Sequence, residues 1–276
     1  MPSNMGSALL PWETTKSKSF QWQGDAIKPS GETSWAPKIS PGGKSGAAAG
    51  KSRPRSEGPA QPPAPRPPSA DELQDRLYAL YRRDHSGGGK PRFDFATDVA
   101  SDSTNERVVI HDRDVVVFGK GFRGGTSYAF ITVGVADGKD ILDATARDLT
   151  GDGKAEIIVR GVLHAKASKA LGGGVVDRYA LFVYAVLGES VVRVFAAETG
   201  RAVGDDRILG SVAFATPERG ATRIELRPGR AQGFSEKTYP FPEDTTAAGG
   251  LEPLILPWSA TAARRYRFDG KTFVSE

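Results

Sequence analysis

Apolar and polar positions change their spacing twice along this chain. At residues 69–86, Leu73, Leu77 and Leu80 recur on one helical face, and Ser69 and Glu72 stand three apart as in a capping box. From about residue 105, β-branched and aromatic residues form short runs separated by Gly, Asp and Pro, which is typical of strands. These runs are RVVIH, DVVVF, SYAFITVGV, AEIIVRGVL, VDRYALFVYAVL, VVRVFAAE, ILGSVAFAT, ATRIELRP, RYRF and KTFV. The pattern predicts a short amphipathic helix and then an all-β domain over residues 90–276, an antiparallel sandwich or barrel-like fold.

Several joints between these runs have the composition of tight turns. LGES at 187–190 and Asp269-Gly270 suit hairpins, and His111 to Asp114 suits a charged turn. Gly119, Gly121 and Gly124 have the G-x-G-x-x-G spacing of a phosphate loop, but a strand pattern follows them where a dinucleotide site needs a helix. We therefore expect a glycine-rich hairpin. Lys120 and Arg123 at its tip could contact an anionic partner.

Residues 1–68 lack any such pattern. Twelve of the 19 prolines fall within residues 1–70, together with many Ser, Gly and Lys. Such a composition buries too little apolar surface to offset the entropy of ordering, which predicts a disordered tail. The prolines at its end predict a stiff spacer, with an SH3-type ligand as the alternative.

Three of the four tryptophans of the chain nevertheless lie in this tail, at Trp12, Trp22 and Trp35. Disordered segments seldom carry aromatic residues. Each tryptophan could serve as an anchor for docking on a partner protein, folding on contact. Trp258 is expected to be a core or rim residue of the β domain.

Charge and composition narrow the class of protein. Residues 1–70 hold nine Lys and Arg against four Asp and Glu, which leaves 37 − 9 = 28 basic against 33 − 4 = 29 acidic residues elsewhere, so the net charge of +4 belongs to the tail. A nucleic-acid binder with a basic folded face is not indicated. The chain has no Cys and three His, so zinc chemistry is not expected, and no apolar run is long enough to span a membrane. Residues 1–20 do not have the pattern of a secretory signal.

A short acidic stretch, DLTGDGKAE at 148–156, is the strongest candidate site. Calcium needs six to eight oxygen ligands, and alternate positions of a curled loop can supply them. The predicted ligands are the side chains of Asp148, Thr150, Asp152 and Glu156 and the backbone carbonyl of Lys154. Val159 stands where an EF-hand has its bidentate glutamate, so an EF-hand is excluded. The alternative is an acidic turn with no ion.

This stretch, from Asp148 to Val159, resembles the calcium loop of FG-GAP and VCBS-type repeats, D-x-[DN]-x-D-G-x-x-[DE] followed by an apolar strand. The resemblance implies a cation-stabilised β module used for adhesion or ligand recognition outside the cell. Thr150 replaces the usual carboxylate or amide, so we expect a weak site, with a dissociation constant of about 10⁻⁴ to 10⁻³ M. DGK recurs at 137–139 and 269–271, but the spacings share no period. We therefore expect a single calcium loop in a non-repetitive domain.

Taken together, these patterns predict a non-catalytic, calcium-stabilised β module that binds a protein or glycan partner, with no catalytic residue and no organic cofactor. Two alternatives stay open: a hydrolase of saccharides or phosphoesters whose carboxylates converge only in the fold, and an assembly component recruited through the tail tryptophans. A calcium site suits the cell envelope or the exterior. A start at Met1 without a signal suits the cytoplasm.

Overall fold

The structure is a computed structural model, and it describes residues 68–85, 88–100, 104–166, 174–215, 222–241 and 250–276. The predicted tail up to residue 67, with Trp12, Trp22 and Trp35, lies outside these residues.

The predicted helix is present as α2 (Ala70–Asp84). Its capping box is confirmed, because Ser69 Oγ accepts a hydrogen bond from Glu72 N at 3.2 Å and Glu72 Oε2 accepts one from Ser69 N at 2.7 Å. These bonds satisfy two backbone N–H groups that a helix start otherwise leaves open. Leu77 and Tyr81 form the buried side of the helix.

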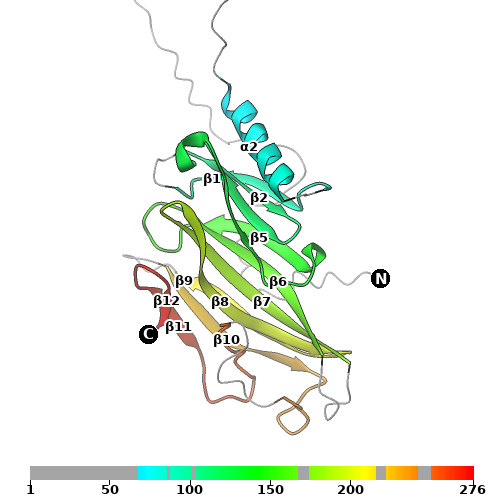
Figure 1. Cartoon of the computed structure of the whole chain (residues 1–276). Helices are drawn as coiled ribbons and strands as arrows, with labels where there is room; N and C mark the ends of the chain where they lie inside the picture. Colours follow the sequence, from blue (N-terminus) through cyan, green and yellow to red (C-terminus); the bar gives the residue numbers. More distant parts are fainter. Residues whose placement is uncertain (1–67, 86–87, 101–103, 167–173, 216–221, 242–249) are drawn as a thin grey trace, which may run out of the picture. The chain divides into compact units, whose positions relative to one another are not determined.

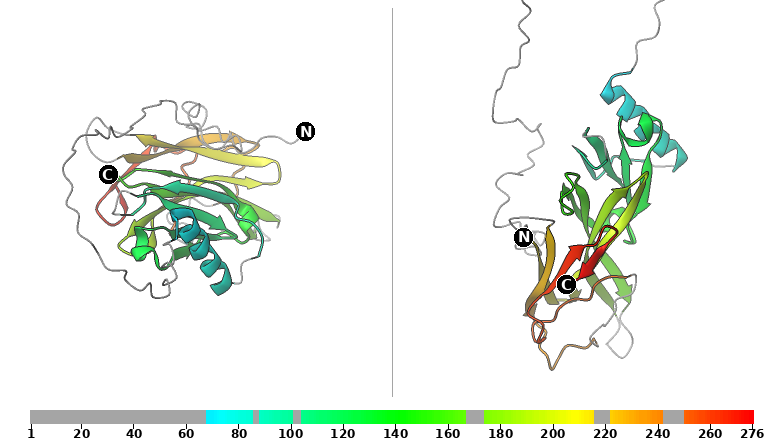
Figure 2. Two further views of the ribbon diagram at one scale, coloured as in Figure 1. Left: turned by 90° about the horizontal axis from the view of Figure 1, so that it is seen from above. Right: turned by 90° about the vertical axis from the view of Figure 1, so that its left-hand side faces the viewer.

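The rest of the described chain is β structure in two antiparallel sheets, which confirms the predicted all-β class (Figures 1 and 2). Strands that follow one another in the sequence lie next to one another in each sheet. The four-stranded sheet contains β1 (Phe93–Thr97), β2 (Glu106–His111), β3 (Asp114–Phe118) and β4 (Ala129–Thr132). The eight-stranded sheet contains β5 (Ile141–Arg147), β6 (Glu156–Lys166), β7 (Val175–Leu187), β8 (Ser190–Val203), β9 (Asp206–Ala215), β10 (Arg223–Gln232), β11 (Arg264–Phe268) and β12 (Phe273–Ser275). Two short 3₁₀ turns, η2 (Phe122–Gly125) and η3 (Gly138–Asp140), precede β4 and β5.

Continuous apolar runs mark strands that are buried on both faces. Side chains alternate between the faces of a strand, so Val108 and Ile110 point to one side of β2 and Val109 to the other. The first side packs with residues of β6 and β7 in a core shared by the two sheets. The second side packs against Leu77 and Tyr81, so α2 covers the outer face of the four-stranded sheet. The opposite face of β6 to β8 packs against residues of β10 to β12 in a further core.

The predicted turns are confirmed. Leu187 pairs with Ser190 across the β7–β8 turn, and Gly188 there has a φ of 63°. His111 pairs with Asp114, which leaves Asp112 and Arg113 as a two-residue hairpin loop. Strands β1 and β5 were not predicted, although FDFAT in β1 alternates apolar and polar residues as a half-buried strand does. No helix among the described residues is long and apolar enough to cross a bilayer.

Candidate functional site

The predicted acidic loop closes the hairpin between β5 and β6, where Arg147 pairs with Glu156. Both carboxylate oxygens of Asp148 accept backbone hydrogen bonds, Oδ1 from Gly151 N at 2.6 Å and Oδ2 from Gly153 N at 3.0 Å. Gly151 and Gly153 have φ values of 78° and 86°, a region that glycine enters without a steric penalty. The loop is therefore wound around the Asp148 side chain.

Glu156 holds the other end of this loop. Only 4% of the residue is exposed, and its Oε2 accepts hydrogen bonds from Leu149 N at 2.7 Å and Thr150 N at 3.2 Å. The Thr150 hydroxyl donates to Oε1 at 3.3 Å. Burial raises the pKa of Glu156 to about 7 against the two backbone hydrogen bonds that lower it, and the charges of Asp152 and Asp148 raise it further.

Asp152 and Lys154 form a separate local turn. Asp152 Oδ1 accepts a hydrogen bond from Lys154 N at 2.9 Å, and the Lys154 ammonium lies 3.6 Å from Oδ2. The fold thus brings the five predicted ligands into one loop, but their carboxylates accept bonds from the loop itself. Among the described residues, no group of three or more His, Cys, Asp or Glu side chains is arranged to hold a metal ion. The oxygen donors suit calcium in kind, but this conformation does not present them as a convergent set.

The hairpin between β1 and β2 is closed by a glutamate in the same way, which the sequence analysis missed. Thr97 pairs with Glu106 as Arg147 pairs with Glu156. Glu106 is fully buried, and its Oε2 accepts hydrogen bonds from the two residues that follow Asp98, Val99 N at 3.2 Å and Ala100 N at 3.1 Å. In the sequence, Asp98, Asp102 and Glu106 stand 50 positions before Asp148, Asp152 and Glu156.

The likeness between the two hairpins extends to the spacing of their acidic residues but not to their glycines. Ser101 and Ser103 replace the two glycines of the later loop, so a search for Asp-Gly-Lys does not find it. The two hairpins also touch, because Ala155 N donates a hydrogen bond to the Asp98 carbonyl at 2.8 Å. The shared signal is the spacing of the acidic residues, and Glu106 and Glu156 close their loops in the same way.

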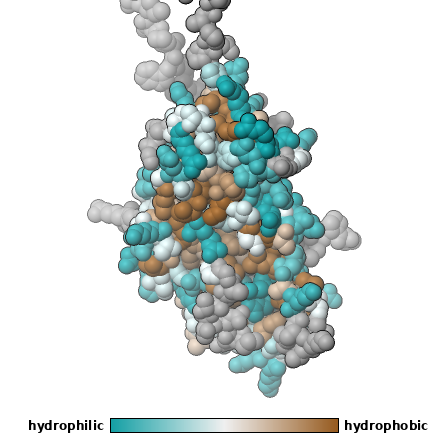
Figure 3. All heavy atoms as spheres, in the orientation of Figure 1, coloured by the Kyte–Doolittle hydropathy of each residue, from teal (hydrophilic) through white to brown (hydrophobic). Residues whose placement is uncertain are grey.

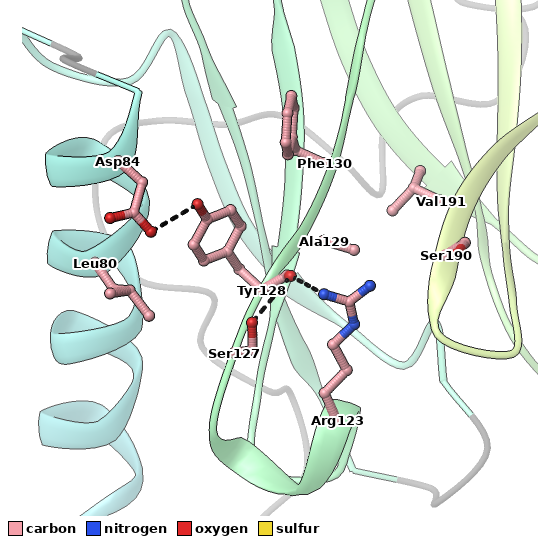
Figure 4. A pocket seen from close by; sticks show the side chains of 9 residues that line it. All are labelled: Leu80, Asp84, Arg123, Ser127, Tyr128, Ala129, Phe130, Ser190 and Val191. Atoms are coloured by element: carbon pink, nitrogen blue, oxygen red, sulfur yellow. Dashed lines mark hydrogen bonds between the residues drawn. The ribbon is translucent and has the colours of Figure 1, made fainter.

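A separate pocket of about 450 Å³ lies between α2, β4 and the β7–β8 hairpin (Figure 4). It is lined by Leu80 and Asp84 of α2, by residues 127–130, by Ser190 and Val191, and by Arg123. Phe130 keeps 39% of its surface exposed. Apolar and charged groups therefore meet at one opening.

Aromatic rings fix the α2 side of this pocket. The Tyr128 hydroxyl donates to Asp84 Oδ2 at 3.0 Å, and burial together with this bond raises the pKa of Tyr128 and keeps it a donor. Hydrogen bonds from Arg83 and then Tyr128 lower the pKa of Asp84. The His85 ring meets the Phe130 ring edge-on, with centroids 4.3 Å apart. Phe130 is thus supported from one side and exposed on the other.

Arg123 sits opposite, in the glycine-rich tip that the sequence singled out. Its backbone is left-handed, with φ 49° and ψ 36°, which is uncommon outside glycine. Its guanidinium is held by backbone carbonyls: Nε and Nη2 donate to Glu189 O at 3.0 and 2.6 Å, and Nη1 donates to Tyr128 O. The guanidinium also lies 5.5 Å from the centre of the Phe122 ring. The cation is fixed in place by groups that carry no formal charge.

Hydrophobic side chains also gather across the middle of the face drawn in Figure 3. Four large hydrophobic residues are exposed in the described chain. One of them, Phe130, lines the pocket, and another, Leu187, pairs with the lining residue Ser190. Comparisons with protein-family models, curated proteins and solved structures found no match for the chain.

Proposed function

We propose that this chain is a non-catalytic binding module whose ligand site is the pocket between α2, β4 and the β7–β8 hairpin. The observation that carries the proposal is the meeting of an exposed aromatic ring, Phe130, with a fixed guanidinium, Arg123, at one opening. Aromatic residues and Arg are enriched in protein interfaces. A volume of about 450 Å³ also lies within the range of small-ligand sites.

The architecture around the pocket supports this proposal because the lining is preorganised. Tyr128 is tied to Asp84 on α2, and Arg123 is tied to the turn of the β7–β8 hairpin. Three elements that are distant in sequence therefore hold the lining side chains before any ligand arrives. Preorganisation lowers the entropy that binding must overcome.

A fragment screen by ligand-observed NMR on the full chain tests the proposal. We expect binders whose affinity falls about tenfold in Phe130→Ala, since a stacked aromatic contact contributes about 0.5 to 1.5 kcal/mol. Leu142→Ala is the matched control, because Leu142 on β5 is also 39% exposed but does not line the pocket. Equal losses in both variants, or turnover of saccharide or phosphoester fragments, would contradict the proposal.

We also propose that the loop at residues 148–156 takes up calcium weakly. Its oxygen-only donors, the two glycines with positive φ and the resemblance to FG-GAP and VCBS-type loops support this. The carboxylates of Asp148 and Glu156 already accept hydrogen bonds from backbone N–H groups, and an ion has to compete with these groups for the carboxylate oxygens. This competition favours millimolar affinity and a stabilising role for the ion.

A further inference from the structure

The Arg123 guanidinium keeps donors that no described group uses. A guanidinium has five N–H bonds, and the carbonyls of Glu189 and Tyr128 take one each from Nε, Nη1 and Nη2. One N–H bond remains on each terminal nitrogen. We infer that the pocket binds a carboxylate joined to an apolar group, with the carboxylate on Arg123 and the apolar group against Phe130. This inference rests on the proposed function of the pocket.

The charge of Arg123 is available to an anion. Within the part of the chain that the structure describes, no carboxylate lies at ion-pair distance from Arg123. Its two carbonyl partners orient the cation without neutralising it. The N–H bond left on each terminal nitrogen can donate to a carboxylate, and charge-assisted bonds of this kind are stronger than neutral ones.

Asp84 is the other charged group of the lining, and its charge is already matched. Arg83 Nη2 lies 3.0 Å from Asp84 Oδ1, and the Tyr128 hydroxyl donates to Asp84 Oδ2. In Figure 4 the Tyr128 ring lies between Asp84 and Arg123. The anion-binding end of the pocket is therefore the Arg123 end.

The apolar half of the ligand is set by the side chains next to this end. Ala129 and Val191 belong to the core between the two sheets, and Phe130 lies on the other face of β4, where its ring is 39% exposed beside His85 and Tyr128. An apolar group placed against Phe130 removes both surfaces from water. The left-handed backbone at Arg123 is a conformation that proteins keep chiefly where neighbouring structure or function requires it.

Isothermal titration of the full chain with N-acetyl-phenylalanine and with its amide tests the inference, since the two probes differ in the carboxylate. We expect the acid to bind about tenfold more tightly than the amide at low salt. Arg123→Gln should remove this preference. Lys120→Gln, which removes an exposed cation from the same turn without touching the pocket lining, should keep it.

Two further arms keep the result decisive. Phe130→Ala should weaken the binding of the acid and of the amide alike. Arg123→Lys keeps the charge but has fewer N–H donors. It should keep part of the preference for the acid even if Arg123→Gln disturbs the turn. A tetrapeptide ending in phenylalanine that binds more tightly than the acetylated amino acid indicates a protein C-terminus as the ligand, whereas equal binding indicates a small carboxylate.

Equal binding of acid and amide, or binding of neither, overturns the inference. If fragments still bind more weakly to Phe130→Ala than to the wild type in that case, the pocket remains a binding site. The proposal of a binding site and the inference of a carboxylate ligand can therefore fail separately.

Discussion

At the scale of single residues, the two buried glutamates show how an acidic side chain can close a loop. Glu106 and Glu156 each accept two backbone hydrogen bonds from residues seven and six positions earlier. Those N–H groups would otherwise be buried without a partner, which costs about 1 to 3 kcal/mol each. Glu156 combines this role with unfavourable burial of its own charge, since its pKa is raised to about 7.

This raised pKa predicts how stability depends on pH. The folded state holds the proton of Glu156 more tightly than the unfolded state, so the stabilising contribution is complete below the unfolded pKa of 4.5 and is lost as pH rises through about 7. Glu156→Gln keeps an oxygen acceptor but cannot ionise. We therefore compare the free energy of unfolding of Glu156→Gln with that of the wild type. The difference, variant minus wild type, should increase by about 1 to 3 kcal/mol as the pH rises from 4.5 to 8.

Urea unfolding of both proteins across this pH range measures the difference. Glu236→Gln, at an exposed glutamate, is the control and should follow the wild type. A constant difference between Glu156→Gln and the wild type at every pH would show that the carboxyl does not titrate in this window.

The calcium proposal also belongs to the residue scale. We expect the unfolding temperature in 5 mM calcium to exceed that in EDTA, since a dissociation constant of about 10⁻⁴ to 10⁻³ M gives about 1 to 2 kcal/mol at that concentration. Asp152→Ala should abolish the rise.

Asp137→Ala is a closely matched control for that experiment. Asp137 makes the same local contacts as Asp152, with Lys139 N at 2.9 Å and the Lys139 ammonium at 3.6 Å, but it lies outside the loop. A rise that survives in Asp152→Ala, or no rise in the wild type, would reduce the loop to an acidic turn.

At the scale of elements, α2 is attached to the four-stranded sheet by packing and by several polar contacts, one of which is a hydrogen bond from Tyr81. Leu77 and Tyr81 pack on Val109, Val116 and Phe118. The Tyr81 hydroxyl donates to Asp114 Oδ2 at 2.9 Å, and burial raises the pKa of Tyr81 so that it stays a donor. The position of α2 matters for the proposed binding site because Leu80 and Asp84 line the pocket.

A double-mutant cycle isolates this attachment. We expect Tyr81→Phe to cost about 1 kcal/mol of unfolding free energy and to couple to Asp114→Ala by at least about 0.5 kcal/mol. Tyr81→Ala, which also empties the ring site, should cost about 3 to 5 kcal/mol. Additive effects of Tyr81→Phe and Asp114→Ala would mean that this hydrogen bond does not contribute to the attachment of the helix.

At the scale of the whole molecule, the sequence predicted elements with strong local signals and missed features that depend on pairing and packing in the folded chain. The helix cap at Ser69 and the turns at 187–190 and 269–270 rest on neighbouring residues, and all are confirmed. Strands β1 and β5 were missed because FDFAT and ILDATAR have few fully buried positions and gain their strand geometry from pairing with β2 and β6.

The pocket shows the same limit. The sequence predicted Arg123 as a cation at the tip of a glycine-rich hairpin. Its hydrogen-bond partner, the carbonyl of Glu189, is 66 residues away in the sequence. Tyr128 and Asp84 are likewise 44 residues apart. No local pattern connects such residues, so the lining becomes visible only in the folded chain. The likeness between the β1–β2 and β5–β6 hairpins could have been found from the sequence. It required a comparison of the spacing of Asp and Glu residues, not a search for the Asp-Gly-Lys motif.

The central claim is that ligands bind where α2, β4 and the β7–β8 hairpin meet. Titrating the ¹⁵N-labelled full chain with the tightest-binding fragment, and following the backbone amide resonances, tests it most directly. The account predicts that the largest shifts fall on Arg123, on residues 127–130 and on Ser190 and Val191. Shifts concentrated on the loop at residues 148–156, or on residues before position 68, would contradict it.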